Sequence, residues 1–143
     1  MLRVVLVEDN PILRIAQESL LRKAGYEVIH AVDGEEALRV IKSERPDVVL
    51  LDMMLPKLSG PEVLCRLKSD PATAHIPVVV VTGLSSKNEE KLERAGASGF
   101  VEKDGLMHAP ERLIRAIERA TGQDHQLSSS RLKTQAATNA ITT

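Results

Sequence analysis

The sequence predicts an α/β fold in which a parallel β-sheet is covered by helices on both faces. Three short segments, residues 4–7, 48–51 and 76–81, contain only apolar residues, as strands buried on both faces do. Segments with the apolar spacing of amphipathic helices alternate with these and two further strands as far as Gly122. Such alternation is typical of parallel strands joined by crossover helices. The chain has 143 residues, which accommodates one domain of this kind.

Turn and capping residues separate the ten predicted elements. Strands are expected at residues 4–7, 26–31, 47–52, 76–81 and 98–103, and helices at 11–24, 33–44, 59–70, 86–96 and 109–122. Helix starts are indicated by Asn10 before Pro11, by Ser59 three residues before Glu62, and by Ser86 three residues before Glu89. Helix ends are indicated by Gly25, Pro46 and Gly96. The inward face of the first helix is expected to carry Leu13, Ala16, Leu20 and Ala24.

Composition limits the classes of function. Hydrophobic residues make up 43% of the chain and charged residues 27%, and the formal net charge is -1, so no strong overall field attracts nucleic acid or acidic lipid. Tyr26 and Phe100 are the only aromatic residues, which leaves no platform for stacking bases. The single cysteine, Cys65, excludes an internal disulfide and a cysteine-based zinc site. No apolar run suits a signal peptide or a membrane span, so we expect a soluble, cytoplasmic protein.

Polar side chains stand where four of the five predicted strands end. They are Glu8 and Asp9, then Asp52, Thr82 and Lys103. Because parallel strands place their carboxyl ends on one edge of the sheet, we expect these side chains to share a cleft. Three carboxylates together favour a hard cation such as Mg²⁺, and an ammonium group suits a phosphoryl group. Each residue alone also fits an ordinary role in a loop or cap, but together they indicate a carboxylate that accepts phosphate.

Four segments of the chain resemble the signature segments of response-regulator receiver domains of two-component signalling, the CheY-like family. They are "LVEDNP", "VVLLDMMLPKLSG", "VVVVTG" and "GFVEK". The resemblance spans roughly residues 2–122, in order and with family-like spacing. It implies a doubly wound, flavodoxin-like sheet with strand order 2-1-3-4-5 and five helices, and a stand-alone receiver domain over residues 1–122.

The resemblance also implies roles for individual residues. Asp52 matches the phosphoacceptor, which takes phosphate from a phosphohistidine on a sensor kinase or a phosphotransfer protein. Glu8, Asp9 and Asp52, with the backbone carbonyl of Met54, match the Mg²⁺ ligands. Thr82 and Lys103 match the switch hydroxyl and the phosphate-binding lysine, and Phe100 matches the aromatic residue whose rotamer couples to Thr82.

The chain departs from the family pattern at three places. Glu8 stands where aspartate is commoner, which favours a water-mediated metal contact. No proline follows Lys103, where the family usually has one, so the loop there is expected to be more mobile. Met54 and Leu84, two residues past Asp52 and Thr82, are both apolar. We expect them to slow autodephosphorylation, because they leave the hydrolytic water without a polar partner.

The function implied by the resemblance is that of a single-domain response regulator. Mg²⁺-dependent phosphorylation of Asp52 would switch a surface formed by the fourth helix, fifth strand and fifth helix toward a downstream protein target. The chain would catalyse only its own phosphorylation and dephosphorylation, without contacting nucleic acid or membrane, as a monomer or a weak phosphorylation-dependent dimer. An alternative is a pseudo-receiver that docks partners and never takes phosphate. A phosphatase of the haloacid-dehalogenase type is disfavoured because it needs a second aspartate where Met54 stands.

The last 21 or so residues differ in composition. Residues 123–143 are mostly polar and hold few large apolar side chains. This pattern fits a disordered tail or the stub of a linker, with a short extra helix around residues 131–140 as the alternative.

Overall fold

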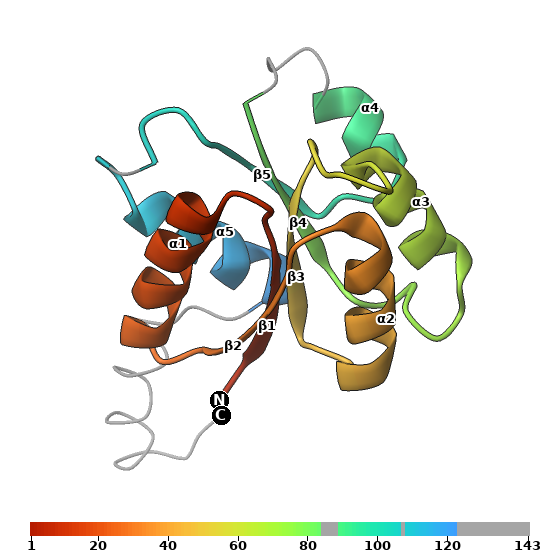
Figure 1. Cartoon of the computed structure of the whole chain (residues 1–143), viewed down its shortest axis with the longest axis horizontal. Coiled ribbons are helices and arrows are strands. Elements are labelled where there is room, and N and C mark those ends of the chain that lie inside the picture. The colour runs from red at the N-terminus through yellow and green to blue at the C-terminus, as the bar shows by residue number, and fades with distance from the viewer. Residues whose placement is uncertain (84–88, 107, 123–143) are drawn as a thin grey trace.

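The structure is a five-stranded parallel sheet between two layers of helices (Figure 1). The computed structural model describes residues 1–83, 89–106 and 108–122. The strand order is β2-β1-β3-β4-β5 and each neighbouring pair is parallel, which confirms the predicted doubly wound fold. The elements are β1 (Arg3–Val7), α1 (Pro11–Lys23), β2 (Glu27–Ala31), α2 (Gly34–Glu44), β3 (Val48–Asp52), α3 (Gly60–Ser69), β4 (Val78–Thr82), α4 (Glu89–Arg94), β5 (Gly99–Glu102) and α5 (Glu111–Thr121).

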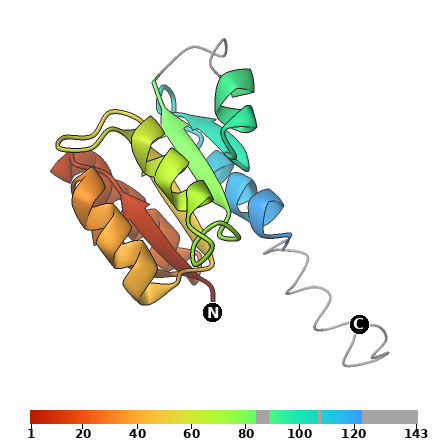
Figure 2. The same cartoon turned by 90° about the vertical axis from the view of Figure 1, so that its right-hand side faces the viewer.

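The two faces of the sheet are covered by different helices, because successive side chains of a strand point to opposite faces. Val5 and Val7 of β1 belong to a buried cluster with residues of α2, α3 and α4, whereas Val4 and Leu6 belong to a second cluster with residues of α1 and α5. Figures 1 and 2 show this division, with α1 and α5 on one side of the sheet and α2 and α3 on the other.

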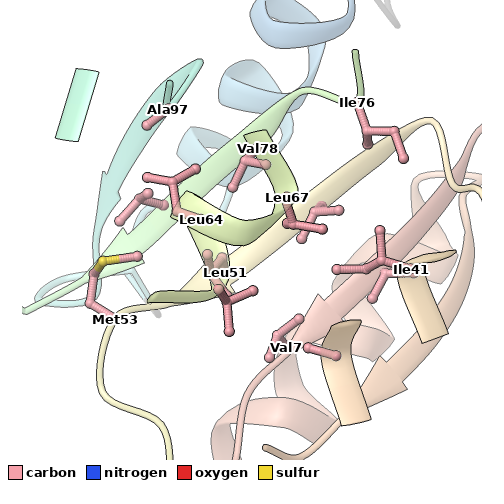
Figure 3. Close-up of a cluster of buried hydrophobic side chains, with 14 of the residues drawn as sticks. Val7, Ile41, Leu51, Met53, Leu64, Leu67, Ile76, Val78 and Ala97 are labelled. Carbon is pink, nitrogen blue, oxygen red and sulfur yellow. The ribbon is translucent and has the colours of Figure 1, made fainter. Parts of the chain in front are cut away.

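The central strands form the middle of the core. Every residue of β3 and of β4 is buried, as the unbroken apolar runs predict. In Figure 3, side chains of adjacent strands meet side chains of α2 and α3; the labelled ones include Val7, Leu51, Val78, Ile41, Leu64 and Leu67. Because the sheet is covered on both sides, the polar groups of these strands, Asp52 and Thr82, lie at the strand ends and are buried there.

Helix caps form largely as predicted. The Asn10 side chain accepts hydrogen bonds from the backbone N–H groups of Ile12 and Leu13, at 2.9 and 3.1 Å. Ser59 accepts a bond from the N–H of Glu62, but the Glu62 carboxylate turns away to Arg66, 3.0 Å distant, so only half of the predicted capping box is made. Ser86, the other predicted cap, lies outside the described residues. No helix within the described ranges has the length and apolar character needed to cross a membrane.

Two predicted details are corrected by the structure. Strand β4 begins at Val78 and not at residue 76, because Pro77 has no N–H and the N–H of Ile76 bonds to the carbonyl of Thr73. The inward face of α1 differs in detail: Leu20 and Ala24 are half-buried and pack against the core as predicted, but the most buried residues of the helix are Gln17 and Leu21. The apolar spacing does not predict burial of Gln17 because its side chain is polar.

Tyr26 provides a pH-dependent probe of the α1 and α5 side of the core. Its side chain is buried, and burial, followed by the nearby charge of Glu118, raises the pKa of Tyr26 from 10.0 to about 12. Between these values the unfolded chain loses the phenolic proton while the folded protein keeps it. The free energy of unfolding is therefore expected to fall by about 2–3 kcal/mol as the pH rises from 10 to 12.

The phenolate absorbance of the folded protein measures this pKa directly, because the chain has one tyrosine and no tryptophan. The urea-unfolded chain is the control and should titrate near the ordinary tyrosine value. A folded-state midpoint equal to that of the unfolded chain would contradict burial of this side chain.

Candidate functional site

The five predicted site residues come together at the carboxyl edge of the sheet. Asp52 is the last residue of β3 and Thr82 the last of β4, whereas Lys103 directly follows β5 and Glu8 directly follows β1. The register keeps these ends level: Val7 pairs with Leu51, Asp52 with Val81, and Thr82 with Glu102. The site lies across β1 and β3, where the strand order reverses, which is the usual place for ligands in such sheets.

Three carboxylates form the centre of the site. One oxygen from each of Glu8, Asp9 and Asp52 lies within 4.8 Å of the other two. Glu8 and Asp52 are buried, with 1% and 2% of their surfaces exposed, whereas Asp9 is exposed. Carboxylate oxygens at this spacing and with access from solvent suit a hard divalent cation such as Mg²⁺, which binds a few carboxylates and retains waters.

Lys103 partly neutralises the buried carboxylates. Its Nζ donates a hydrogen bond to Asp52 Oδ2 at 2.9 Å and lies 3.3 Å from Glu8 Oε1. Burial alone would lower the pKa of Lys103, but the hydrogen bond and charge of Asp52, together with Glu8, raise it above the ordinary lysine value. The lysine therefore stays charged, and it explains how Asp52 is accommodated in an apolar strand.

The negative charge of Glu8 is only partly compensated by its neighbours. Burial is the largest influence that raises the pKa of Glu8 above its usual value, and the charge of Asp52 adds to it. Lys103 opposes this, as does the backbone N–H of Asn10, which donates to Glu8 Oε2 at 3.2 Å. Three carboxylates thus face one ammonium group among the described residues of the site, an imbalance that a bound divalent cation would correct.

The backbone around Asp52 is held in place by close packing. The N–H of Met54 donates to Asp52 Oδ1 at 3.1 Å, so both oxygens of this carboxylate are oriented. The N–H of Gly60 donates to the carbonyl of Met53 at 3.1 Å, and a Cβ on Gly60 would lie 2.5 Å from the Asp52 carbonyl oxygen. Gly34 approaches Leu58 even more closely. These two glycines allow the close packing that supports the site, and the sequence analysis did not predict this role. Each is the first residue of a helix, and this position was the only indication in the sequence that a small residue is required there.

Of the other predicted residues, the structure describes Thr82, Phe100 and Met54. Thr82 is buried, and its carbonyl accepts a hydrogen bond from the N–H of Lys103 at 3.0 Å. Phe100 is half-buried on β5 and packs against the cluster that β3 and β4 share with α3. The Met54 side chain is 73% exposed beside the site. Leu84 lies outside the described residues.

Comparison with known proteins identifies the family to which the chain is similar. Residues 4–118 match the family described as the response regulator receiver domain. The chain is 39% identical over 101 residues to the polar-differentiation response regulator DivK of Brucella anthropi, a match that covers 70% of this chain and 82% of that protein. It is also 40% identical over 121 residues to the gliding motility regulatory protein of Myxococcus xanthus, which covers 84% of this chain and only 15% of that much longer protein.

Solved structures agree with this match. The chemotaxis protein CheY4 of Vibrio cholerae superposes with a TM-score of 0.76 at 29% identity, over 84% of this chain and 98% of that one. The receiver domain of the sensor histidine kinase PA1611 of Pseudomonas aeruginosa superposes with a TM-score of 0.72 at 27% identity, over 85% and 98% of the two chains. That structure holds a magnesium ion in its active-site cleft.

Proposed function

Because the chain belongs to the response regulator receiver domain family, we propose that it is a phosphorylation-controlled switch with Asp52 as the phosphoacceptor. The observation that carries this proposal is the cluster of three carboxylate oxygens within 4.8 Å, with Lys103 Nζ 2.9 Å from Asp52. A carboxylate, a cation and a place for a divalent metal are what phosphoryl transfer to an aspartate requires. The phosphodonor in this proposal is a sensor histidine kinase or a phosphotransfer protein, and the protein acts in the cytoplasm.

In the proposed reaction an oxygen of Asp52 attacks the phosphorus of a phosphohistidine. The bond between phosphorus and the imidazole nitrogen breaks, the electron pair leaves with the imidazole, and an acyl phosphate forms on Asp52. Glu8, Asp9, Asp52 and the backbone carbonyl of Met54 would hold Mg²⁺, which neutralises charge on the transferred phosphoryl oxygens. Lys103 releases the Asp52 carboxylate and pairs with a phosphoryl oxygen, and the Thr82 hydroxyl donates to another. The protein turns over no separate substrate.

Labelling with a small phosphodonor tests the proposal. The full chain incubated with acetyl phosphate and Mg²⁺ is expected to gain the mass of one phosphoryl group, and Asp52→Asn is expected to gain none. Asp104→Asn is the matched control, because Asp104 is an exposed carboxylate next to Lys103 and lies outside the carboxylate cluster. Omitting Mg²⁺ should slow labelling at least tenfold, which would be detected by intact-mass spectrometry over time.

The same experiment separates the switch from its alternative. A pseudo-receiver that only docks partners would remain unlabelled as wild type, and equal labelling of wild type and Asp52→Asn would place the acceptor elsewhere. Either result would end the proposal. We also propose that Met54 and Leu84 lengthen the life of the acyl phosphate, since the exposed thioether of Met54 is only a weak acceptor for the hydrolytic water and donates no hydrogen bond.

We propose that the phosphorylation signal is read on the surface of α4, β5 and α5. A groove of about 480 Å³ runs along β5 and α5 and is reached by Glu89 of α4. Phe100, whose neighbour on β4 is Val80, lines this groove and connects it to the β4 strand that ends in Thr82. The groove is also lined by Arg112, Arg115 and Arg119. Arg115 and Arg119 form no ion pair with any described carboxylate, which favours a partner with acidic residues.

Charge reversal in this groove should uncouple output from phosphorylation. The double variant Arg115→Glu, Arg119→Glu is expected to be labelled by acetyl phosphate at the wild-type rate, because neither residue lies in the carboxylate cluster. Its affinity for the phosphorylation-dependent target should fall at least tenfold, through loss of attraction to acidic groups. Arg14→Glu on α1 is the control for a change of charge elsewhere. Unchanged target binding by the double variant, measured by calorimetry, would exclude the groove as the output surface.

A further inference from the structure

The two edges of the sheet differ in how their outward backbone groups are covered. Strands β2 and β5 form these edges (Figure 1). The N–H of Glu27 bonds to the carbonyl of Leu2, so Glu27 faces β1 and the next residue, Val28, faces outward. At this edge the guanidinium of Arg22 donates to the Val28 carbonyl at 3.2 Å. A side chain that covers an outward carbonyl in this way helps to keep an edge strand from pairing with another chain.

Strand β5 leaves its outward backbone groups uncovered. The carbonyl of Thr82, on β4, accepts from the N–H of Lys103 at 3.0 Å, and the register partner of Thr82 is Glu102. In a parallel ladder a residue bonds to the two residues that flank its partner, so Glu102, and Phe100 two positions before it, point their N–H and C=O groups outward. Among the described residues, no side chain or loop forms a hydrogen bond with these four groups.

The groove of about 480 Å³ along β5 and α5 follows this open edge. All of residues 98–102 line it. Because the side chains of a strand alternate between the two faces of a sheet, a groove lined by five successive residues runs along the backbone edge of the strand. Its volume lies within the range of protein ligand pockets, roughly 300–1,000 Å³. An uncovered edge beside a groove suits an extended peptide that adds a strand to the sheet.

The two walls of the groove differ in charge. Helix α5 contributes Arg115 and Arg119, which are exposed and form no ion pair with a described carboxylate. On the α4 side, Phe100 lies half-buried, and Glu89 and Glu102 are negative. Successive side chains of an added strand would point to these walls in turn. Acidic side chains at every second position would meet the arginines, and apolar side chains between them would meet the aromatic ring.

We propose that the open edge of β5 binds an extended segment of a partner protein as a sixth strand, with acidic side chains toward α5 and apolar side chains toward Phe100. The outward N–H and C=O groups of Phe100 and Glu102 pair with the backbone of this segment, and Arg115 and Arg119 pair with its carboxylates. This mode of binding specifies the partner of the proposed output surface. Any effect of phosphorylation on it rests on the proposed function, whereas strand addition itself does not.

Titration of the isotopically labelled full chain with the acetylated and amidated peptide Glu-Val-Glu-Val-Glu, followed by NMR, tests the proposal. Saturable shifts are expected in the amide signals of Phe100 and Glu102. At saturating peptide these two amides should exchange with solvent at least fivefold more slowly, because they become hydrogen-bonded. Absence of saturable shifts at millimolar peptide, or unchanged exchange in the complex, would overturn the proposal.

Charge and order are tested separately. The double variant Arg115→Glu, Arg119→Glu should bind the peptide at least tenfold more weakly, whereas Arg14→Glu on α1 should bind it as wild type does. A peptide of the same composition in the order Val-Val-Glu-Glu-Glu should bind at least fivefold more weakly, because its side chains do not alternate. Equal binding of the two peptides would show attraction by charge alone and would contradict strand addition.

Methylation of the peptide backbone distinguishes an added strand from other modes of binding. In an added strand only alternate residues bond to β5. The valines do so in an antiparallel strand, and the glutamates do so in a parallel one. Methylation of both valine nitrogens, or of the second and third glutamate nitrogens, should therefore abolish binding in one case and preserve it in the other. Loss of binding in both cases, or in neither, would exclude a sixth strand.

Glu102→Pro and Glu102→Ala form a matched pair of variants. Both remove the carboxylate, but only proline removes the outward N–H, and this group forms no bond to β4. Glu102→Ala should bind the acidic peptide at least as tightly as wild type, whereas Glu102→Pro should bind at least fivefold more weakly than Glu102→Ala. Equal binding by two folded variants would contradict the proposal. The methylated peptides give the same test on the wild-type chain, so the outcome does not depend on the proline variant folding.

Two controls separate this inference from another occupant and from the proposed function. Shifts of the Phe100 and Glu102 amides with protein concentration alone would identify a second copy of the chain as the occupant and overturn the proposal. A chain that binds the peptide but is not labelled by acetyl phosphate would refute only the proposed function. A chain that is labelled but fails to bind the peptide, with or without acetyl phosphate, would refute only strand addition.

Discussion

Replacing Lys103 by methionine is expected to destabilise the protein by up to about 3 kcal/mol at neutral pH in the absence of Mg²⁺. The substitution keeps the length of the side chain and removes the one cation among the described residues that contacts both Asp52 and Glu8. Removing one partner of a buried ion pair costs about 3–5 kcal/mol when the remaining charge is fully buried. The lower end of this range applies to Lys103 because its side chain is 25% exposed, so water screens part of the interaction.

The dependence of this loss on pH has a definite sign. The pKa of Glu8 lies above its ordinary value of 4.5 even with the lysine present, so the folded protein holds the Glu8 proton more tightly than the unfolded chain does. The stability of the variant should therefore recover as the pH falls toward 4.5, because Glu8 takes up a proton in the folded protein before it does so in the unfolded chain. Mg²⁺ should also recover it, because a cation that binds only the folded state stabilises that state.

Urea unfolding at several pH values, with and without Mg²⁺, measures both effects. Lys42→Met is the matched control, since Lys42 forms an exposed pair with Asp70 at 3.5 Å and its loss should cost less than about 1 kcal/mol. Equal stabilities of Lys103→Met and Lys42→Met, or an Mg²⁺ response no larger than that of wild type, would show that the lysine does not neutralise the site.

Gly60→Ala is expected to destabilise the protein by about 2–3 kcal/mol and to slow labelling of Asp52. The added Cβ would lie 2.5 Å from both the Asp52 carbonyl oxygen and the Met53 Cα. Both are backbone atoms, so they cannot move aside as a flexible side chain would. The end of β3 must shift, and with it the Asp52 carboxylate relative to Glu8, Asp9 and Lys103.

Gly83→Ala provides the comparison, because Gly83 follows Thr82 at the same edge of the sheet and a Cβ there meets no atom within 4 Å. Its stability and its labelling by acetyl phosphate should remain close to those of wild type. The two variants differ in clearance and share the chemical change, so a similar loss in both would point to chain flexibility and not to packing against Asp52.

Much of the fold can be predicted from the sequence because strand burial and helix capping leave local signals. The apolar runs of β3 and β4 and the Asn10 cap were all recognisable, and the structure confirms them. Local signals were insufficient where neighbours elsewhere in the chain decide the outcome. Glu62 suits a capping box, yet it pairs with Arg66. Gln17 is polar, as most surface residues are, yet it is buried on the face of α1 that points toward the β5–α5 connection.

The sequence by itself determined which chemical groups stand at the carboxyl ends of the strands, because an acid or a lysine can follow a buried strand only where that strand emerges. Only the tertiary structure decided how these groups meet. The register of β1, β3, β4 and β5 brings Lys103 Nζ to 2.9 Å from Asp52, and close packing at Gly60 holds the carbonyl of the same aspartate. Such distances depend on contacts between residues about fifty positions apart, and no local pattern encodes them.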